Sequence, residues 1–162
     1  MKLHFLGVGN AQAAELGNAA AVLEHNGQPL LLLDCGADTL PRYAQAYPDT
    51  PLPQAVFITH AHLDHIGGLE NLFYRAYFVP NGDLIRLYVP VRLLETLQRR
   101  LADYPSILAE GGANYWDAFQ LIPVSEQFWH KNLRFSVFPV RHHDYGSAYG
   151  IALAGQFLYT GD

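Results

Sequence analysis

Three histidines and an aspartate stand within six positions of one short stretch, FITHAHLDHIGG at residues 57–68. They are His60, His62, Asp64 and His65. Imidazole nitrogens and carboxylate oxygens are preferred ligands of zinc and similar divalent ions, and a loop can direct residues two apart to one point. His60 and His62 therefore fit one metal ion, and Asp64 and His65 could serve a second. Two ions about 3.5–4 Å apart form the bimetallic arrangement used in hydrolysis.

An accidental histidine-rich loop is the alternative interpretation of this cluster. At the frequencies of this chain, such a four-residue pattern arises by chance roughly once in a thousand sequences. We therefore expect metal binding. His4, His25 and His130 are isolated in the sequence, and a lone histidine is more often a surface or core-edge group than a ligand.

The elements that must position the cluster are visible as short apolar runs and helical repeats. The run Ala55–Thr59 predicts a strand that leads into the cluster, and Asp64 and His65 follow where the next helix should begin. Asn26-Gly27 between two runs predicts a hairpin, because both residues tolerate positive φ. The other predicted strands are Leu3–Leu6, Ala20–Leu23, Leu30–Leu33, Phe119–Val124, Leu133–Val140, Gly150–Ala154 and Gln156–Thr160, and the predicted helices are Thr39–Tyr47, Leu69–Ala76 and Pro90–Tyr104.

The order of these elements predicts an α/β or α+β fold with a mixed sheet. The 162 residues suit one domain, residues 1–162, and half of them are hydrophobic, which is enough for a core. A net charge of −5 with 10 lysines and arginines argues against a general binder of polyanions. The single Cys35 excludes an internal disulfide, no secretory signal or apolar run of about 20 residues is present, and we expect a cytoplasmic protein without a membrane partner.

The segment His60-Ala61-His62-Leu63-Asp64-His65 after a strand resembles the H-x-H-x-D-H signature of the metallo-β-lactamase superfamily. Three other stretches resemble the same family in the same order. They are the opening strands that lead to the Asp34-Cys35-Gly36 turn, the segment FPVRHHDYGSAYGIAL, and the final FLYTGD. The resemblance implies a metallo-β-lactamase-like αββα sandwich, of which this chain holds the N-terminal portion.

The resemblance also implies a set of metal ligands. His60, His62 and His142 would hold the first ion, Asp64 and His65 the second, and Asp162 would bridge the two. His142 is preferred over His143 as third histidine because the family's residue usually lies two positions after Pro-Val, as in Pro139-Val140-Arg141-His142. His143 would then lie behind a ligand or face the substrate, and Asp34 would orient a ligand, unless Asp34 is only a polar strand end.

The resemblance implies a hydrolase with one or two divalent ions, Zn²⁺ first and Mn²⁺ or Fe as alternatives. A metal-bound hydroxide would be the nucleophile, and Asp64 would orient it or take its proton. LGVGNAQ, DCG and SAYG look most like the branch with tRNA 3′-processing endonucleases and related phosphodiesterases. The chain lacks a visible basic cluster for tRNA, so a small-molecule or nucleotide phosphodiester is the expected substrate.

The family takes a last metal-binding histidine from a C-terminal half that this sequence lacks, so we expect a domain truncated relative to the family. Its strand edges would then be open, and another copy of the chain could cover them as a homo-oligomer. Two other functions stay open. One is a metal-binding remnant without catalysis that acts as an association module, and the other is redox chemistry on iron.

Overall fold

The structure is a computed structural model that describes residues 1–79, 82–101, 107–109, 111–142 and 147–162. It contains a six-stranded sheet of order β1-β2-β3-β4-β5-β8 and a four-stranded sheet of order β12-β11-β10-β9. The strands of the two sheets are β1 (Lys2–Gly7), β2 (Ala20–His25), β3 (Gln28–Leu33), β4 (Ala55–Phe57), β5 (Ile85–Pro90), β8 (Phe119–Val124), β9 (Gln127–His130), β10 (Leu133–Pro139), β11 (Tyr149–Leu153) and β12 (Phe157–Tyr159).

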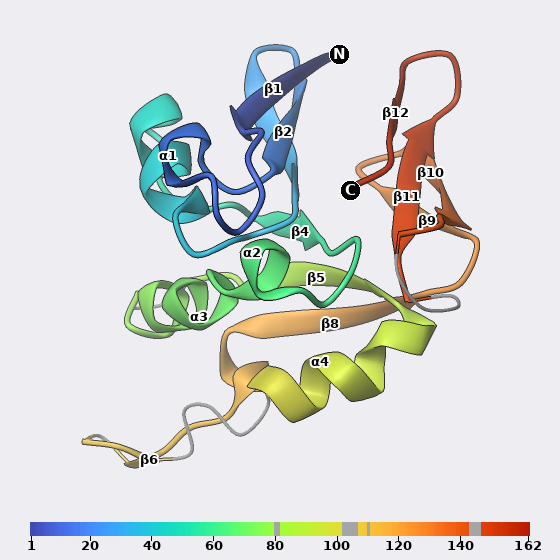
Figure 1. Cartoon of the computed structure of the whole chain (residues 1–162). Coiled ribbons are helices and arrows are strands. Elements are labelled where there is room, and N and C mark those ends of the chain that lie inside the picture. Colours follow the sequence, from blue (N-terminus) through green and yellow to red (C-terminus); the bar gives the residue numbers. More distant parts are fainter. Residues whose placement is uncertain (80–81, 102–106, 110, 143–146) are drawn as a thin grey trace.

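The helices lie on one side of the six-stranded sheet, and the four-stranded sheet lies on the other (Figure 1). A separate short hairpin of β6 (Ile107–Leu108) and β7 (Gly111–Gly112) projects from the body. The helices are α1 (Thr39–Ala46), α2 (Leu63–Ile66), α3 (Leu69–Tyr77) and α4 (Leu94–Leu101), with short 3-10 turns at Ala14–Leu16, Val91–Leu93 and Tyr115–Asp117.

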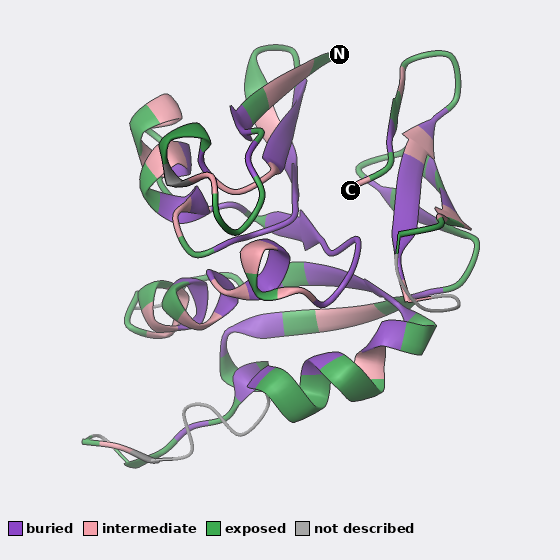
Figure 2. Ribbon diagram, in the orientation of Figure 1, coloured by how far each residue is buried: buried purple, intermediate pink, exposed green. Residues whose placement is uncertain are grey.

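The six-stranded sheet is mixed, as the sequence predicted. β1, β2 and β3 pair antiparallel, whereas β3, β4, β5 and β8 run parallel. The hairpin between β2 and β3 turns at Asn26 and Gly27, whose φ angles of 53° and 77° are those of the expected tight turn. β3, β4 and β5 are largely buried (Figure 2), because helices cover one face and the second sheet the other, whereas β8 at the edge of the sheet is only partly buried.

The core between the sheets is aromatic. Phe128 of β9 stacks on Phe57 of β4 and on Tyr88 of β5, with ring centroids 5.9 and 4.2 Å apart. His130 is also buried here, with Nδ1 2.9 Å from the Tyr88 hydroxyl and Nε2 3.2 Å from the Leu30 carbonyl oxygen. These contacts fix the second sheet against the first.

Two strands of the larger sheets were missed by the sequence analysis, as were the short β6 and β7. β5 (Ile85–Pro90) was not predicted, and Pro90, which was expected to start a helix, is instead the last residue of that strand. The helical segment begins at Val91, and residues 102–104 of the predicted helix lie outside the described residues. β9 (Gln127–His130) was also missed. Over the residues that the structure describes, no helix has the length and apolar character that a membrane crossing requires.

Candidate metal centre

The histidine cluster lies in the loop that leaves β4 and in the short helix α2 that follows. The backbone around Thr59 and His60 is held by the second sheet, since the Tyr149 N–H donates to the Thr59 carbonyl at 2.9 Å and His60 forms an isolated bridge with Ala148. Arg100 of α4 also donates to the carbonyl of Ala61. Contacts with the second sheet and with α4 therefore hold the loop without any metal ion.

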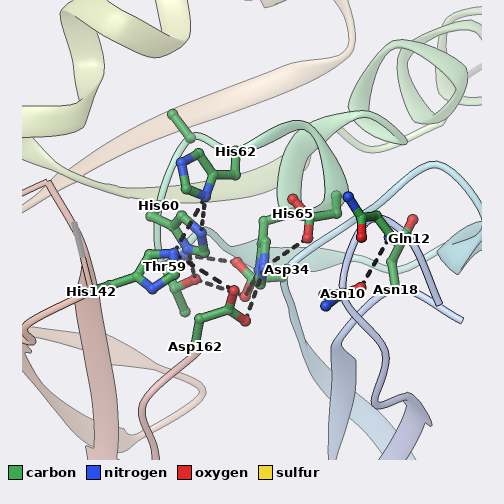
Figure 3. A network of polar contacts seen from close by, with 12 residues as sticks. Asn10, Gln12, Asn18, Asp34, Thr59, His60, His62, His65, His142 and Asp162 are labelled. Atoms are coloured by element: carbon green, nitrogen blue, oxygen red, sulfur yellow. Dashed lines mark hydrogen bonds and ion pairs between the residues drawn. The ribbon is translucent and has the colours of Figure 1, made fainter. Parts of the chain in front are cut away.

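A first group of ligand atoms comes from His60, His62 and His142. His60 Nε2 lies 3.1 Å from His62 Nδ1, and the same Nδ1 lies 3.3 Å from His142 Nε2. These three residues form a group that could hold a metal ion, and their rings converge in Figure 3. His142 follows β10, so the second sheet supplies the third nitrogen.

These distances fit a metal ion. Two nitrogens bound at about 2.0–2.1 Å to one tetrahedral zinc lie roughly 3.3–3.4 Å apart. The observed separations of 3.1 and 3.3 Å are close to that value. Three imidazoles with this spacing are the three protein ligands typical of a catalytic zinc site, in which the fourth coordination position is left for water or substrate.

A second group contains His60, His65 and Asp162. His65 Nε2 lies 3.2 Å from Asp162 Oδ1, and the other oxygen of Asp162 lies 3.6 Å from His142 Nε2. The carboxylate of Asp162 therefore reaches toward both groups. The fully buried Nε2 of His65 forms no hydrogen bond of good geometry with Asp162 or with another described residue, and a buried polar atom of this kind is costly unless an ion or water satisfies it.

Asp64 lies beside the second group but is a member of neither group among the described residues. Its Oδ2 is 3.7 Å from His65 Nε2, and its side chain is 10% exposed. Its backbone is held by a close approach: a Cβ on Gly36 would lie 2.1 Å from the Asp64 carbonyl oxygen. Only glycine fits there, which explains the Gly36 of the Asp-Cys-Gly turn.

Asp34 lies behind the histidines and is completely buried. Its Oδ1 accepts from the Thr59 N–H at 2.8 Å, and its Oδ2 accepts from the Thr59 hydroxyl at 2.7 Å and lies 2.9 Å from His65 Nδ1. The Tyr159 hydroxyl points to the same oxygen from 3.5 Å. Asp34 also has a positive φ of 62°, a strained conformation for a residue with a Cβ, so it is more than a polar strand end.

The carboxylates dominate the electrostatics of His65. Burial by itself lowers the pKa of this imidazole, but the hydrogen bond to Asp34 and the negative charges of Asp34, Asp162 and Asp64 outweigh it, and the pKa is raised. A concentration of negative charge around a buried histidine is an environment that also attracts a cation.

The structure thus brings together seven of the eight residues that the sequence predicted for this site: Asp34, His60, His62, Asp64, His65, His142 and Asp162. The eighth, His143, lies outside the described residues. Sequence reasoning missed Thr59 and Tyr159, which contact Asp34. A hydroxyl residue directly before the first histidine was the available signal for Thr59, whereas nothing in the sequence distinguished Tyr159.

Comparison with known proteins places this centre in a family. The family model described as "Anti-Pycsar protein Apyc1" matches residues 1–162. An Apyc1 protein of Paenibacillus harenae is 30% identical over 171 residues, covering all of this chain and 67% of that protein, and one of Bacillus phage 010DV004 is 34% identical over 145 residues, covering 88% and 53%. A ribonuclease Z of Shouchella clausii is 34% identical over 125 residues, covering 68% and 39%.

The solved structures that match share the fold at low sequence identity. The metallo-β-lactamase fold protein YhfI of Bacillus subtilis has a TM-score of 0.72 at 19% identity, covering 96% of this chain and 59% of that one. A diphosphatase of the PhnP family has a TM-score of 0.70 at 18% identity, covering 93% and 61%. Zn²⁺-bound PqqB of Methylobacterium extorquens has a TM-score of 0.64 at 18% identity, covering 96% and 62%.

The predicted α/β fold is therefore confirmed as a metallo-β-lactamase fold, a fold whose members bind divalent metals and include hydrolases. The chain spans between about half and two thirds of the length of three curated Apyc1 relatives that it matches. The match of the family model over all 162 residues, together with the convergent histidines, shows that this chain belongs to the Apyc1 family of metallo-β-lactamase-fold proteins.

Proposed function

We propose that this protein is a metal-dependent hydrolase of small phosphodiesters. The observation that carries the proposal is a pair of metal-ligand groups that share His60. The first group consists of three histidines, and the second consists of two histidines and a carboxylate. A pair of adjacent ion positions is the arrangement that clamps the attacking and leaving oxygens of a phosphoryl group.

The residues divide into three roles in this proposal. His60, His62 and His142 would hold one ion, Asp64 and His65 the second, and Asp162 would lie between them, with His143 as the alternative third histidine. Zn²⁺ is the proposed ion, because imidazole-rich sets suit it, with Mn²⁺ or Fe as alternatives. When bound, such ions lower the pKa of a coordinated water and polarise a phosphoryl oxygen.

Asp64 would hold the attacking water through a carboxylate oxygen and accept its proton. Its position at the edge of the second group, 3.7 Å from His65 Nε2, supports this role. The close backbone contact with Gly36 also supports this role, because it fixes the position of the Asp64 backbone.

A small substrate is favoured over a nucleic acid by the charge of the chain. With 15 acidic against 10 basic residues, the chain has few cations to neutralise a long phosphate backbone. The smallest nucleotide that contains a phosphodiester is a cyclic mononucleotide. The ribonuclease Z relative and the diphosphatase neighbour support phosphorus chemistry in general.

The test combines metal content with turnover. The purified chain is loaded with Zn²⁺, Mn²⁺ or Fe²⁺ in turn, and hydrolysis of bis-p-nitrophenyl phosphate, a linear dinucleotide and a cyclic mononucleotide is measured. We expect bound metal and turnover in the wild type, loss of most metal in His60→Ala, and retained metal with strongly reduced turnover in Asp64→Asn. His25→Ala is the matched control, because His25 is exposed and contacts Met1 Sδ rather than the centre. Full metal content in His60→Ala refutes the ligand assignment.

A second candidate function is a metal-binding module without catalysis. It is favoured by one observation, the outward face of the second sheet, where Trp129 and Leu158 are each 63% exposed. Exposed large apolar side chains on one sheet face are typical of an association surface, for a second copy of this chain or for another polypeptide. Bound metal without turnover on any of the three phosphodiesters, together with a concentration-dependent mass in light scattering, would support this second function.

A further inference from the structure

We infer that Thr59 is a positioning residue that sets the tautomer of His60, so that the single carboxylate of Asp34 orients histidines of both proposed metal positions. The inference rests on the proposed function, since it assigns a role relative to the ions. It extends that function to a residue outside the metal-binding motif, and it follows from a count of donors and acceptors around Asp34.

The count begins at the carboxylate. An ionised carboxylate only accepts hydrogen bonds, whereas a threonine hydroxyl has one proton to donate and lone pairs to accept with. Thr59 Oγ1 lies 2.7 Å from Asp34 Oδ2, so the hydroxyl proton is directed to the carboxylate. The same Oγ1 lies 3.0 Å from His60 Nδ1. Because the hydroxyl has no second proton, the His60 Nδ1–H must donate to Oγ1.

This direction of donation decides which nitrogen of His60 faces the ions. A neutral imidazole with its proton on Nδ1 has its lone pair on Nε2. His60 Nε2 is the atom 3.1 Å from His62 Nδ1, within the first ligand group. The relay through Thr59 therefore presents the atom that an ion needs, in the manner of carboxylate–histidine–metal triads with one hydroxyl inserted.

The same carboxylate orients His65 without a relay. His65 Nδ1 lies 2.9 Å from Asp34 Oδ2, so its proton also points to the carboxylate and its lone pair is on Nε2. That Nε2 belongs to the second group with Asp162. One buried oxygen thus receives a proton from each branch, besides the more distant Tyr159 hydroxyl, and both branches end in an Nε2 lone pair (Figure 3).

Thr59 is held so that this geometry persists. Its side chain is completely buried, and its backbone N–H donates to Asp34 Oδ1 at 2.8 Å while its carbonyl accepts from the Tyr149 N–H at 2.9 Å. Gly161 packs against the side chain so closely that a Cβ there would lie 2.8 Å from Oγ1. A hydroxyl with fixed backbone and little free space cannot rotate away from Asp34 without losing a buried hydrogen bond.

Two substitutions separate the hydroxyl from the shape of the side chain. Thr59→Val keeps the branched shape and removes the hydroxyl, whereas Thr59→Ser keeps the hydroxyl and removes the methyl group. We expect Thr59→Val to weaken Zn²⁺ binding about 10–100-fold in a chelator competition, the usual effect of losing a partner behind a ligand. We expect Thr59→Ser to bind within about threefold of the wild type, since the partner is retained.

The direct readout is the tautomer of His60 in the metal-free protein, measured by ¹⁵N NMR of the imidazole nitrogens and assigned by the loss of the signal in His60→Ala. We expect the Nδ1–H tautomer in the wild type and in Thr59→Ser, and a shift toward the Nε2–H tautomer in Thr59→Val. A wild-type His60 with its proton on Nε2 overturns the inference, even if Thr59→Val fails to fold. A folded Thr59→Val with wild-type Zn²⁺ affinity overturns it as well.

The two proposals can fail separately. The tautomer is measured without metal or substrate, so a protein that binds no Zn²⁺ would refute the proposed function while the NMR result still decides the role of Thr59. Conversely, a hydrolase with intact metal content and a His60 protonated on Nε2 would retain the proposed function and lose this inference.

Discussion

Replacing Asp34 by asparagine keeps the size of the side chain but removes an acceptor at the centre of the site. In the wild type four donors converge on the carboxylate, namely the N–H and the hydroxyl of Thr59, the Nδ1–H of His65 and, from 3.5 Å, the Tyr159 hydroxyl. An asparagine offers one acceptor oxygen and an NH₂ group that only donates. If the oxygen keeps the Thr59 N–H, the NH₂ group faces the Thr59 hydroxyl and His65 Nδ1.

The Thr59 hydroxyl can avoid the donor–donor contact by rotating, whereas His65 can avoid it only by changing its tautomer. His65 would accept at Nδ1 and place its proton on Nε2, where Asp162 Oδ1 is 3.2 Å away, and an ion would have to displace that proton. Loss of such a supporting carboxylate costs about 10–100-fold in metal affinity. At about 1.4 kcal/mol for each factor of ten, the change in binding free energy is about 1.4–2.8 kcal/mol.

The assay is a Co²⁺ or Zn²⁺ titration in competition with a chromophoric chelator, with the cobalt absorption spectrum as a second readout of the ligand set. Asp38→Asn is the matched control, because it is the same chemical change four residues away. Asp38 accepts from the Asn18 N–H and from Arg42 Nε, each at 3.0 Å, and neither partner belongs to the ligand groups.

The expected pattern is a weaker site in Asp34→Asn and wild-type affinity in Asp38→Asn. Wild-type metal affinity in a folded Asp34→Asn protein would falsify the reasoning, because it would mean that the ligand histidines need no oriented partner. Equal weakening in both variants would also refute it, since that result would trace the effect to general negative charge.

Three further changes test other parts of the structure. Burial lowers the pKa of His130, an effect that the Leu30 carbonyl opposes and that Arg86 and Lys131 strengthen. The unfolded chain therefore binds the proton first, and the free energy of unfolding falls as the pH drops through the region near 6.5. Urea titrations between about pH 7.5 and about pH 5.5 should show a weaker dependence of the unfolding free energy on pH in His130→Gln, and an identical dependence would contradict this. Gly36→Ala should lower the free energy of unfolding by about 1–3 kcal/mol in urea, because its Cβ would lie 2.1 Å from a backbone oxygen; Gly82→Ala, with 3.4 Å to its nearest neighbour, is the control, and equal midpoints would be the contrary result. Chelation of an ion present at about a hundred times its Kd should remove about 2.7 kcal/mol of stability. A melting temperature that a chelator leaves unchanged in the metal-loaded protein would contradict preferential binding of the ion to the folded chain.

The fold could be predicted from the sequence wherever local patterns decide the structure. The apolar run of β3 and the Asn26-Gly27 turn carry their own signals, and both were confirmed. β5 was missed because Arg86 interrupts its apolar run and Pro90 fits a helix start equally well. Its strand character comes from its parallel neighbours β4 and β8, which lie far away in sequence. β9 has only four residues and is defined by its pairing with β10.

The site divides in the same way. His60, His62, Asp64 and His65 could be recognised from spacing alone, because a loop and a short helix bring neighbouring residues together. His142 and Asp162 could be named only through the resemblance to a family, since their approach depends on how the two sheets pack. The role of Thr59 could not be predicted, because it depends on distances to Asp34 and His60 that a sequence does not contain.

The division of the ligands between two sheets has a consequence for assembly. His62 and His142 are 80 residues apart, and the second of them follows β10 of the other sheet. A chain whose first sheet has formed can offer only part of the ligand set, and closing so long a loop has an entropic cost that grows with its length. The three-nitrogen group is therefore complete only after the sheets have docked. An ion bound by these nitrogens would be captured late in folding and would cross-link the two sheets.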